Sequence, residues 1–278
     1  MRIAFLLQKS ASDVGGSPLS LVTLEIIAHL HRMGAQVDLI TPEAAPLDIG
    51  AIRPRHDLYV LKSKTPLTLS LAGALTRAGA EIVNTAWSSG LARDKIAATA
   101  ILAASDVPVP PSWATGGVGH LQPVLKEGPL WIKPPQGSRG VGVRRLSNVA
   151  ELDGLETLTD SYGLPLPLFA QREAPSNGRD LKVYVVGEQV WAITRPFPAQ
   201  TLEDKLGEFI PLSPKIRTAA LRVGQALGLE LYGVDFLSIR DQFSVVDVNA
   251  FPGYKGVAEA PHFIAQYLYE RARRAAVQ

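Results

Sequence analysis

Apolar residues in the first part of the chain fall into two alternating patterns. Continuous apolar runs, as expected for strands covered on both faces, lie at Ile3–Leu7, Val37–Ile40, Leu58–Leu61 and Ile82–Val83. Residues 17–34 and 67–78 carry apolar side chains at helical spacing, and the first of these helices is predicted to begin at Ser17-Pro18 and end at Gly34. Strands that alternate with helices predict a parallel, doubly wound sheet over residues 1–90.

Two further units are predicted, at residues 91–168 and 169–278. The former combines a strand with helices at 95–104 and about 149–158. The latter is strand-rich, and Gly187-Glu188 marks a two-residue hairpin turn. Its remaining elements are a helix at 216–227, strands at 233–239 and 243–248 joined by a turn at 240–242, and a last amphipathic helix at 261–274. The predicted fold class is therefore α/β over residues 1–90, followed by two units of the α+β kind over residues 91–278.

Composition excludes several classes of protein. The 278 residues are 46% hydrophobic and 19% charged with a net charge of +2, which argues against disorder and against a nucleic-acid partner. The chain contains no cysteine, so disulfides, thiolate metal sites and cysteine nucleophiles are excluded. No apolar stretch has the length of a membrane span or a signal-peptide core. We expect a soluble, cytoplasmic protein.

A glycine-rich loop follows the strand that ends at Lys133. Its sequence, PPQGSRGVGV, has three glycines within six residues, so backbone N–H groups could approach a phosphate closely while Lys133 neutralises its charge. The spacing matches neither the P-loop nor the dinucleotide-binding fingerprint. Taken alone, the loop fits a glycine-rich β-hairpin equally well.

Three oxygen-bearing side chains are predicted to meet on two paired strands. Asp235 lies on the first strand, and Asp247 and Asn249 lie two residues apart on the second, so they share a face. Hard oxygen ligands of this kind suit Mg²⁺ that bridges nucleotide phosphates. The alternative is that the carboxylates pair with Arg or Lys side chains.

Other candidate residues carry weaker signals. Lys62, Lys95 and Lys182 stand in apolar surroundings, where any single lysine is usually a solvated face residue. The five histidines show no metal-ligand spacing, and no nucleophile elbow is present. Phosphoryl chemistry on a bound nucleotide therefore fits better than covalent catalysis.

Taken together and in order, these pieces resemble the ATP-grasp superfamily. The matching segments are RDK at 93–95, IKPPQGSRGVGV at 132–143, FAQREAPSNGRDLKVYVVGE at 169–188, and YGVDFL with VVDVNAFPGYKGV at 232–257. The resemblance implies an ATP-grasp fold with an N-terminal Rossmann-like domain, with ATP and Mg²⁺ as cofactors. It implies a metal site at Asp235, Asp247 and Asn249, and catalytic roles for Lys133, Arg195 and Asp247.

The resemblance also implies the residues that contact the nucleotide. The glycine loop would close over the triphosphate, residues 171–174 would lie beside the adenine, and Asp180 would lie on the ribose side. The full set is Lys95, Lys133, Gln136, Gly137, Ser138, Gly140, Gln171, Arg172, Glu173, Ala174 and Asp180.

Two branches of the superfamily compete for the activity. The string DVNAFPGYKGV resembles the inositol trisphosphate kinase family, whereas the RDK lysine and the glycine loop resemble RimK-type carboxylate–amine ligases. We expect a kinase that transfers the γ-phosphoryl group to a small anionic acceptor; a ligase is the alternative, and a noncatalytic nucleotide-binding module is a third reading. The expected acceptor-binding residues are Lys9, Lys62, Lys182, Arg195, Gly253 and Lys255.

Overall fold

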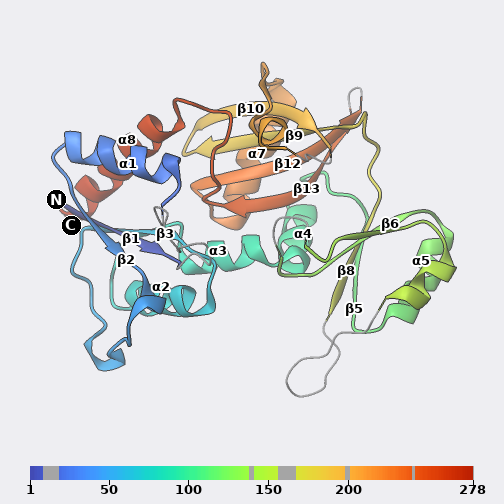
Figure 1. The fold of residues 1–278 in the computed structure, drawn as a ribbon, viewed down its shortest axis with the longest axis horizontal. Coiled ribbons are helices and arrows are strands. Elements are labelled where there is room, and N and C mark those ends of the chain that lie inside the picture. Colours follow the sequence, from blue (N-terminus) through green and yellow to red (C-terminus); the bar gives the residue numbers. More distant parts are fainter. Residues whose placement is uncertain (9–18, 138–140, 156–166, 198–200, 240–241, 278) are drawn as a thin grey trace.

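The computed structural model describes residues 1–8, 19–137, 141–155, 167–197, 201–239 and 242–277, and within these ranges the strands form three sheets (Figure 1). The N-terminal sheet is parallel, in the order β2-β1-β3-β4. Its strands are β1 (Arg2–Leu7), β2 (Gln36–Ile40), β3 (Leu58–Lys62) and β4 (Ile82–Val83). The helices around it are α1 (Leu21–Arg32) and α2 (Pro66–Arg77), with short 3₁₀ turns at Pro42–Ala44 and Ile49–Ala51.

The alternation of side chains along β1 explains why both faces of this sheet are covered. Ile3 and Phe5 pack toward α1, whereas Ala4 and Leu6 pack toward α2. Helix α1 begins later than predicted, because Ser20 is its N-cap and accepts a hydrogen bond from the Thr23 N–H. The predicted start at Ser17-Pro18 lies outside the described residues.

The central sheet is antiparallel, in the order β5-β8-β6-β7. Its strands are β5 (Ser112–Thr115), β6 (Leu130–Lys133), β7 (Arg144–Leu146) and β8 (Leu168–Arg172). Leu130 and Ile132 are buried on the face that packs on α5 (Gln122–Lys126), beside the 3₁₀ turn Val118–Leu121. The helix predicted near 149–158 is a 3₁₀ turn at Val149–Gly154, and its predicted end lies outside the described residues.

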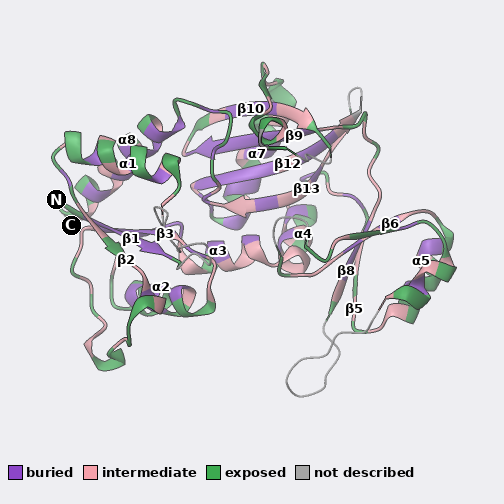
Figure 2. Cartoon of the chain, viewed as in Figure 1, coloured by how far each residue is buried: buried purple, intermediate pink, exposed green. Residues whose placement is uncertain are grey.

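The C-terminal sheet is antiparallel, in the order β11-β10-β9-β12-β13. Its strands are β9 (Arg179–Val186), β10 (Gln189–Pro196), β11 (Glu208–Phe209), β12 (Leu231–Ile239) and β13 (Gln242–Ala250). Its helices are α6 (Leu202–Leu206), α7 (Pro214–Leu227) and α8 (Ala260–Ala275), and helices α3 (Ala86–Arg93) and α4 (Lys95–Ala104) connect the N-terminal part to the rest. Both faces of β9 are buried from Asp180 to Val186, and most of its arrow is purple in Figure 2.

The packing of the sheets differs from the predicted division of the chain. Strand β8 belongs to the central sheet, so the boundary near residue 168 falls at the start of a strand of that sheet. Helix α4, assigned to the central unit, packs against the C-terminal sheet through Ala98 and Leu102. Helix α8 returns to the N-terminal sheet and packs beside α1, so one core joins the two ends of the chain.

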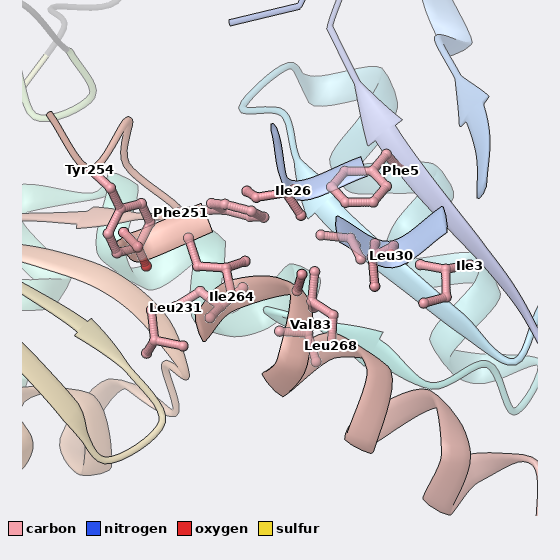
Figure 3. Packing of buried hydrophobic residues seen from close by; sticks show 14 of the residues in the cluster. Ile3, Phe5, Ile26, Leu30, Val83, Leu231, Phe251, Tyr254, Ile264 and Leu268 are labelled. Atoms are coloured by element: carbon pink, nitrogen blue, oxygen red, sulfur yellow. The ribbon is translucent and has the colours of Figure 1, made fainter. Parts of the chain in front are cut away.

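That shared core holds the N-terminal sheet against the C-terminal sheet. Figure 3 shows Phe5 and Leu30 from the first segment, with Leu231, Ile264 and Leu268 from the last. Burying these apolar groups stabilises the contact between parts of the chain that are more than 200 residues apart in sequence. The carboxyl end of β3 thereby lies against the segment that follows β13.

Replacing Leu268 with Ala is expected to lower the free energy of unfolding by about 2–5 kcal/mol, because the side chain is fully buried and leaves a cavity. Urea denaturation measures this change. Gln266→Ala, on the exposed face of the same helix, is the control and should change stability by less than about 0.5 kcal/mol. Equal effects of the two substitutions would contradict a core built on α8.

Candidate active site

A cleft lies between the central and C-terminal sheets. The space between its walls, including the open mouth, is about 920 Å³. Polar and charged side chains from β6, β8, β9, β10, β12 and β13 meet apolar ones in its wall. The lining residues are Lys95, Trp131, Lys133, Pro134, Gly137, Val141, Val143, Gln171, Arg172, Ala174, Asp180, Arg195, Phe197, Asp235, Leu237, Val246 and Asp247.

Lys133 enters this cleft from β6. The strand alternates, so Leu130 and Ile132 point into the core while Trp131 and Lys133 line the cleft. The Lys133 ammonium donates to Gln171 Oε1 at 2.7 Å and to the Val246 carbonyl oxygen at 3.4 Å. Burial lowers the pKa of Lys133 to about 8, although the nearby Asp247 acts in the opposite direction. An anion in the cleft would therefore stabilise its charged form.

The two predicted metal-binding aspartates lie directly opposite each other. Asp235 on β12 pairs in register with Asp247 on β13, next to a bulge at Val246 of β13. Asn249 lies two residues beyond Asp247, and its Nδ2 donates to Asp247 Oδ2 at 3.2 Å. The structure thus brings together the three oxygen-bearing side chains that the sequence pattern predicted.

Each aspartate also has a lysine partner, as expected from the alternative interpretation in which the carboxylates pair with Arg or Lys side chains. Lys182 Nζ lies 2.5 Å from Asp235 Oδ1, and Lys95 Nζ lies 3.8 Å from Asp247 Oδ1. Among the described residues no group of three or more His, Cys, Asp or Glu side chains could hold a metal. Asp235, Asp247 and Asn249 offer two carboxylates and one amide oxygen, which are hard ligands that suit Mg²⁺. The residues present therefore fit that ion.

Asp180 and Arg195 form a second charge pair beside the metal candidates. Arg195 donates to both carboxylate oxygens of Asp180, at 2.7 and 2.8 Å, and its Nη2 lies 3.8 Å from Asp235 Oδ1. Burial raises the pKa of Asp180, and the Arg195 hydrogen bonds oppose that shift. Asp180, the predicted ribose-side residue, is thus already paired with Arg195, one of the predicted catalytic residues.

The first half of the glycine loop is attached to Lys95, the first residue of α4. The Lys95 N–H donates to the Pro135 carbonyl at 2.9 Å, and Lys95 Nζ donates to the Gly137 carbonyl at 3.2 Å. Gly142 has a positive φ, and a Cβ there would lie 2.8 Å from Pro134 Cγ, so the turn requires glycine. Gln136 is exposed, and Ser138 and Gly140 lie outside the described residues. Strands β6 and β7 pair on either side, so the loop does connect a β-hairpin.

The predicted adenine-side segment lies at the end of β8. Gln171 supports Lys133, and Ala174 lines the cleft. The Arg172 side chain donates to the carbonyls of Gly128 and Val124, and Glu173 accepts two hydrogen bonds from Arg145, at 2.6 and 2.7 Å. Their side chains are therefore committed to the protein, and their backbone N–H groups donate to the Pro111 and Pro129 carbonyls.

Of the predicted acceptor residues that the structure describes, Arg195 alone lines this cleft. Lys62 Nζ donates to the Pro252 carbonyl at 3.4 Å and lies 4.0 Å from the centre of the Phe251 ring. Lys182 is buried against Asp235. Gly253 and Lys255 are exposed on the turn after β13, and Lys9 lies outside the described residues.

Two cations near the site were missed in the sequence. Lys64 Nζ donates to Asn249 Oδ1 at 3.2 Å, and Arg93 Nη1 donates to the Lys64 carbonyl at 2.6 Å. Burial lowers the pKa of Lys64; Asp247 opposes the shift, and the charges of neighbouring cations add to it. Arg93 lies two residues before Lys95 in the RDK segment, and Lys64 lies two residues after Lys62 at the end of β3. Closeness in sequence to these predicted site residues is the signal that could have identified Arg93 and Lys64.

Solved structures with the same fold define the class of protein. A RimK domain ATP-grasp protein from Sphaerobacter thermophilus superimposes with a TM-score of 0.74 and 19% identity, covering 97% of this chain and 100% of the other. A D-alanine–D-alanine ligase from Bacillus anthracis, solved with ATP, gives a TM-score of 0.74 at 19% identity, covering 99% and 98%. The protein has the ATP-grasp fold.

Its family follows from the sequence comparison. The model of the RimK-like ATP-grasp domain matches residues 92–265, well over half of the chain, and the chain belongs to that family. A probable alpha-L-glutamate ligase of Shewanella loihica is 25% identical over 265 residues, 89% of this chain and 85% of the relative. One from Sodalis glossinidius is 27% identical over 252 residues, 82% and 84%.

These findings correct one expectation and confirm another. The expected inositol-phosphate-type kinase is wrong, because the matched family is RimK-like and these relatives are named as ligases. ATP and Mg²⁺ as cofactors are confirmed for this ATP-grasp protein, and a structure of the ATP-grasp ligase PsnB holds Mg and ADP. No helix among the described residues is long and apolar enough to cross a bilayer.

Lys62→Met is expected to raise the free energy of unfolding at pH 7 by ~1–3 kcal/mol, because it removes a buried ammonium. Burial, with the charge of Lys64, lowers the pKa of Lys62 to about 8. The unfolded chain holds this proton up to about 10.5, so the cost of the ammonium lessens as the pH rises above 8. Urea denaturation should show the gain shrinking between pH 8 and 10; a gain independent of pH would contradict the buried charge. Lys126→Met, on the exposed face of α5, is the control.

Proposed function

We propose that this protein is an ATP- and Mg²⁺-dependent ligase that joins a carboxylate to an amine through an acyl phosphate. L-Glutamate is the proposed substrate on one side of the new bond. Membership of the RimK-like family supports the reaction class, and the names of the relatives in Shewanella loihica and Sodalis glossinidius support the amino acid. The substrates are thus small molecules or peptides that carry a carboxylate.

The observation that supports this proposal most strongly is that lysine and aspartate side chains line the same cleft. Lys95 and Lys133 reach it from either side of the glycine loop, and Asp235 and Asp247 face it from paired strands. Lysines neutralise the phosphates of a nucleotide, and the carboxylates suit the ion that accompanies it. A cleft of this kind supports transfer of a γ-phosphoryl group.

We assign the nucleotide and metal roles accordingly. Lys95, Lys133 and the glycine loop would contact the phosphates, and the backbone of residues 171–174 would face the adenine. Asp235, Asp247 and Asn249 would hold Mg²⁺, which neutralises charge on the transferring phosphoryl group when it is bound. Lys182 and Arg195 would orient Asp235, since both lie within ion-pair distance of its Oδ1, at 2.5 and 3.8 Å.

The proposed reaction has two steps. A carboxylate oxygen bonds to the γ-phosphorus while the bond between that phosphorus and the β,γ-bridging oxygen breaks, which gives ADP and an acyl phosphate. The amine then bonds to the carbonyl carbon, inorganic phosphate leaves, and the nitrogen loses a proton. Lys133 and Lys95 are placed to stabilise the charge that develops on the phosphoryl oxygens.

Oxygen-isotope transfer tests this function directly. The protein is incubated with ATP, Mg²⁺ and L-glutamate, together with amino acids and short peptides, and the carboxylates of all these acids, glutamate included, carry ¹⁸O. The acyl phosphate route predicts that each phosphate released carries one ¹⁸O and that mass spectrometry detects a new amide of glutamate. Phosphate free of ¹⁸O in every mixture, or a γ-phosphoryl group retained on a stable organic ester, would contradict the ligase.

A further inference from the structure

Two cations at the junction of the N-terminal sheet with β13 have no anionic partner among the described residues. Lys64 donates to the amide oxygen of Asn249, and Arg93 donates to the backbone carbonyl of Lys64, and both acceptors are neutral. No carboxylate of the described chain lies within ion-pair distance of either side chain. Partly buried cations are stabilised by an anion.

The neighbouring cations have other contacts. Lys62, which also has no carboxylate within ion-pair distance among the described residues, donates to the Pro252 carbonyl and lies over the Phe251 ring. Lys182 and Arg195 are paired with Asp235 and Asp180, respectively. Lys95 and Lys133 line the nucleotide cleft, whereas Lys64 and Arg93 are absent from its described lining. The unmatched charge therefore lies on the side of the metal candidates away from the nucleotide phosphates.

The position of both side chains is set by the fold. Arg93 is the last residue of α3, and Lys64 immediately precedes Thr65, the N-cap of α2. The Arg93–Lys64 hydrogen bond, at 2.6 Å, joins these two segments. Asn249, which accepts from Lys64, is itself held by Asp247. The cations are thus presented by regular structure next to the reacting centre.

We propose that Lys64 and Arg93 bind the carboxylate substrate, an inference that rests on the proposed ligase function. The carboxylate must lie beside the metal candidates to reach the γ-phosphorus, and that is where the two unmatched charges lie. The planar guanidinium of Arg93 suits a two-oxygen acceptor, and Lys64 adds a point charge. The N-terminal part of the chain thereby supplies the recognition of the acid.

This placement also serves the second step. When an amine adds to the carbonyl carbon of the acyl phosphate, the carbonyl oxygen gains negative charge. The oxygen of the carboxylate that did not attack phosphorus becomes that carbonyl oxygen, so it stays beside Lys64 and Arg93. Cations fixed before the reaction stabilise such charge without reorganising.

The reverse half-reaction tests the pair with a defined probe. Acetyl phosphate and MgADP should give acetate and ATP, which luciferase measures. Lys64→Met and Arg93→Gln should each lower kcat/KM for acetyl phosphate at least tenfold, while the KM for MgADP stays within twofold of wild type. Lys64→Arg should retain most of the activity, because it keeps the charge. Lys126→Met, remote on α5, should behave as wild type.

Three outcomes are decisive. Loss confined to acetyl phosphate, with calorimetric affinity for Mg-AMPPNP unchanged, supports the assignment. Variants within twofold of wild type for acetyl phosphate overturn it while the ligase function stands. A wild-type protein that forms no ATP from acetyl phosphate would overturn the acyl phosphate function, and this assignment with it.

Discussion

The pairing of β12 with β13 places two carboxylates opposite each other in a sheet whose interior is apolar. Asp235 and Asp247 cannot be moved apart without breaking that register, and buried like charges need cations to offset their repulsion and lost hydration. Much of the site follows from this constraint. Lys182, Lys95 and Lys64 each approach one of the three metal candidates, and they come from three separate segments of the chain.

The shared apolar core makes that convergence possible. Helix α8 packs on α1 and on the N-terminal sheet, so the end of β3 is held against the turn after β13. In this way the contact between Lys64 and Asn249 depends on burial far from the cleft. The hydrophobic effect thus positions the charged side chains, on which the proposed phosphoryl transfer depends.

Local patterns predicted much of this architecture. The parallel sheet followed from the apolar runs of β1 to β4, and the metal candidates followed from the spacing of Asp247 and Asn249. Lys64 and Arg93 escaped because their roles depend on tertiary contacts, one of them across 185 residues. The predicted kinase was wrong because DVNAFPGYKGV carries the proposed metal ligands, which any γ-phosphoryl transfer would need. Such a string says little about which acceptor is bound elsewhere.

We propose that Asp247 exchanges its lysine partner, Lys95, for the metal that accompanies the nucleotide. Calorimetric titration with AMPPNP, at zero and at saturating Mg²⁺, tests it in wild type and in Asp247→Asn. The affinity of the wild-type protein for AMPPNP should rise at least tenfold with Mg²⁺. The variant has lost a negative charge but little volume, so without Mg²⁺ it should bind AMPPNP at least as tightly as wild type. Its affinity should gain little from the ion. An equal gain from Mg²⁺ in both proteins would contradict a metal site at Asp247.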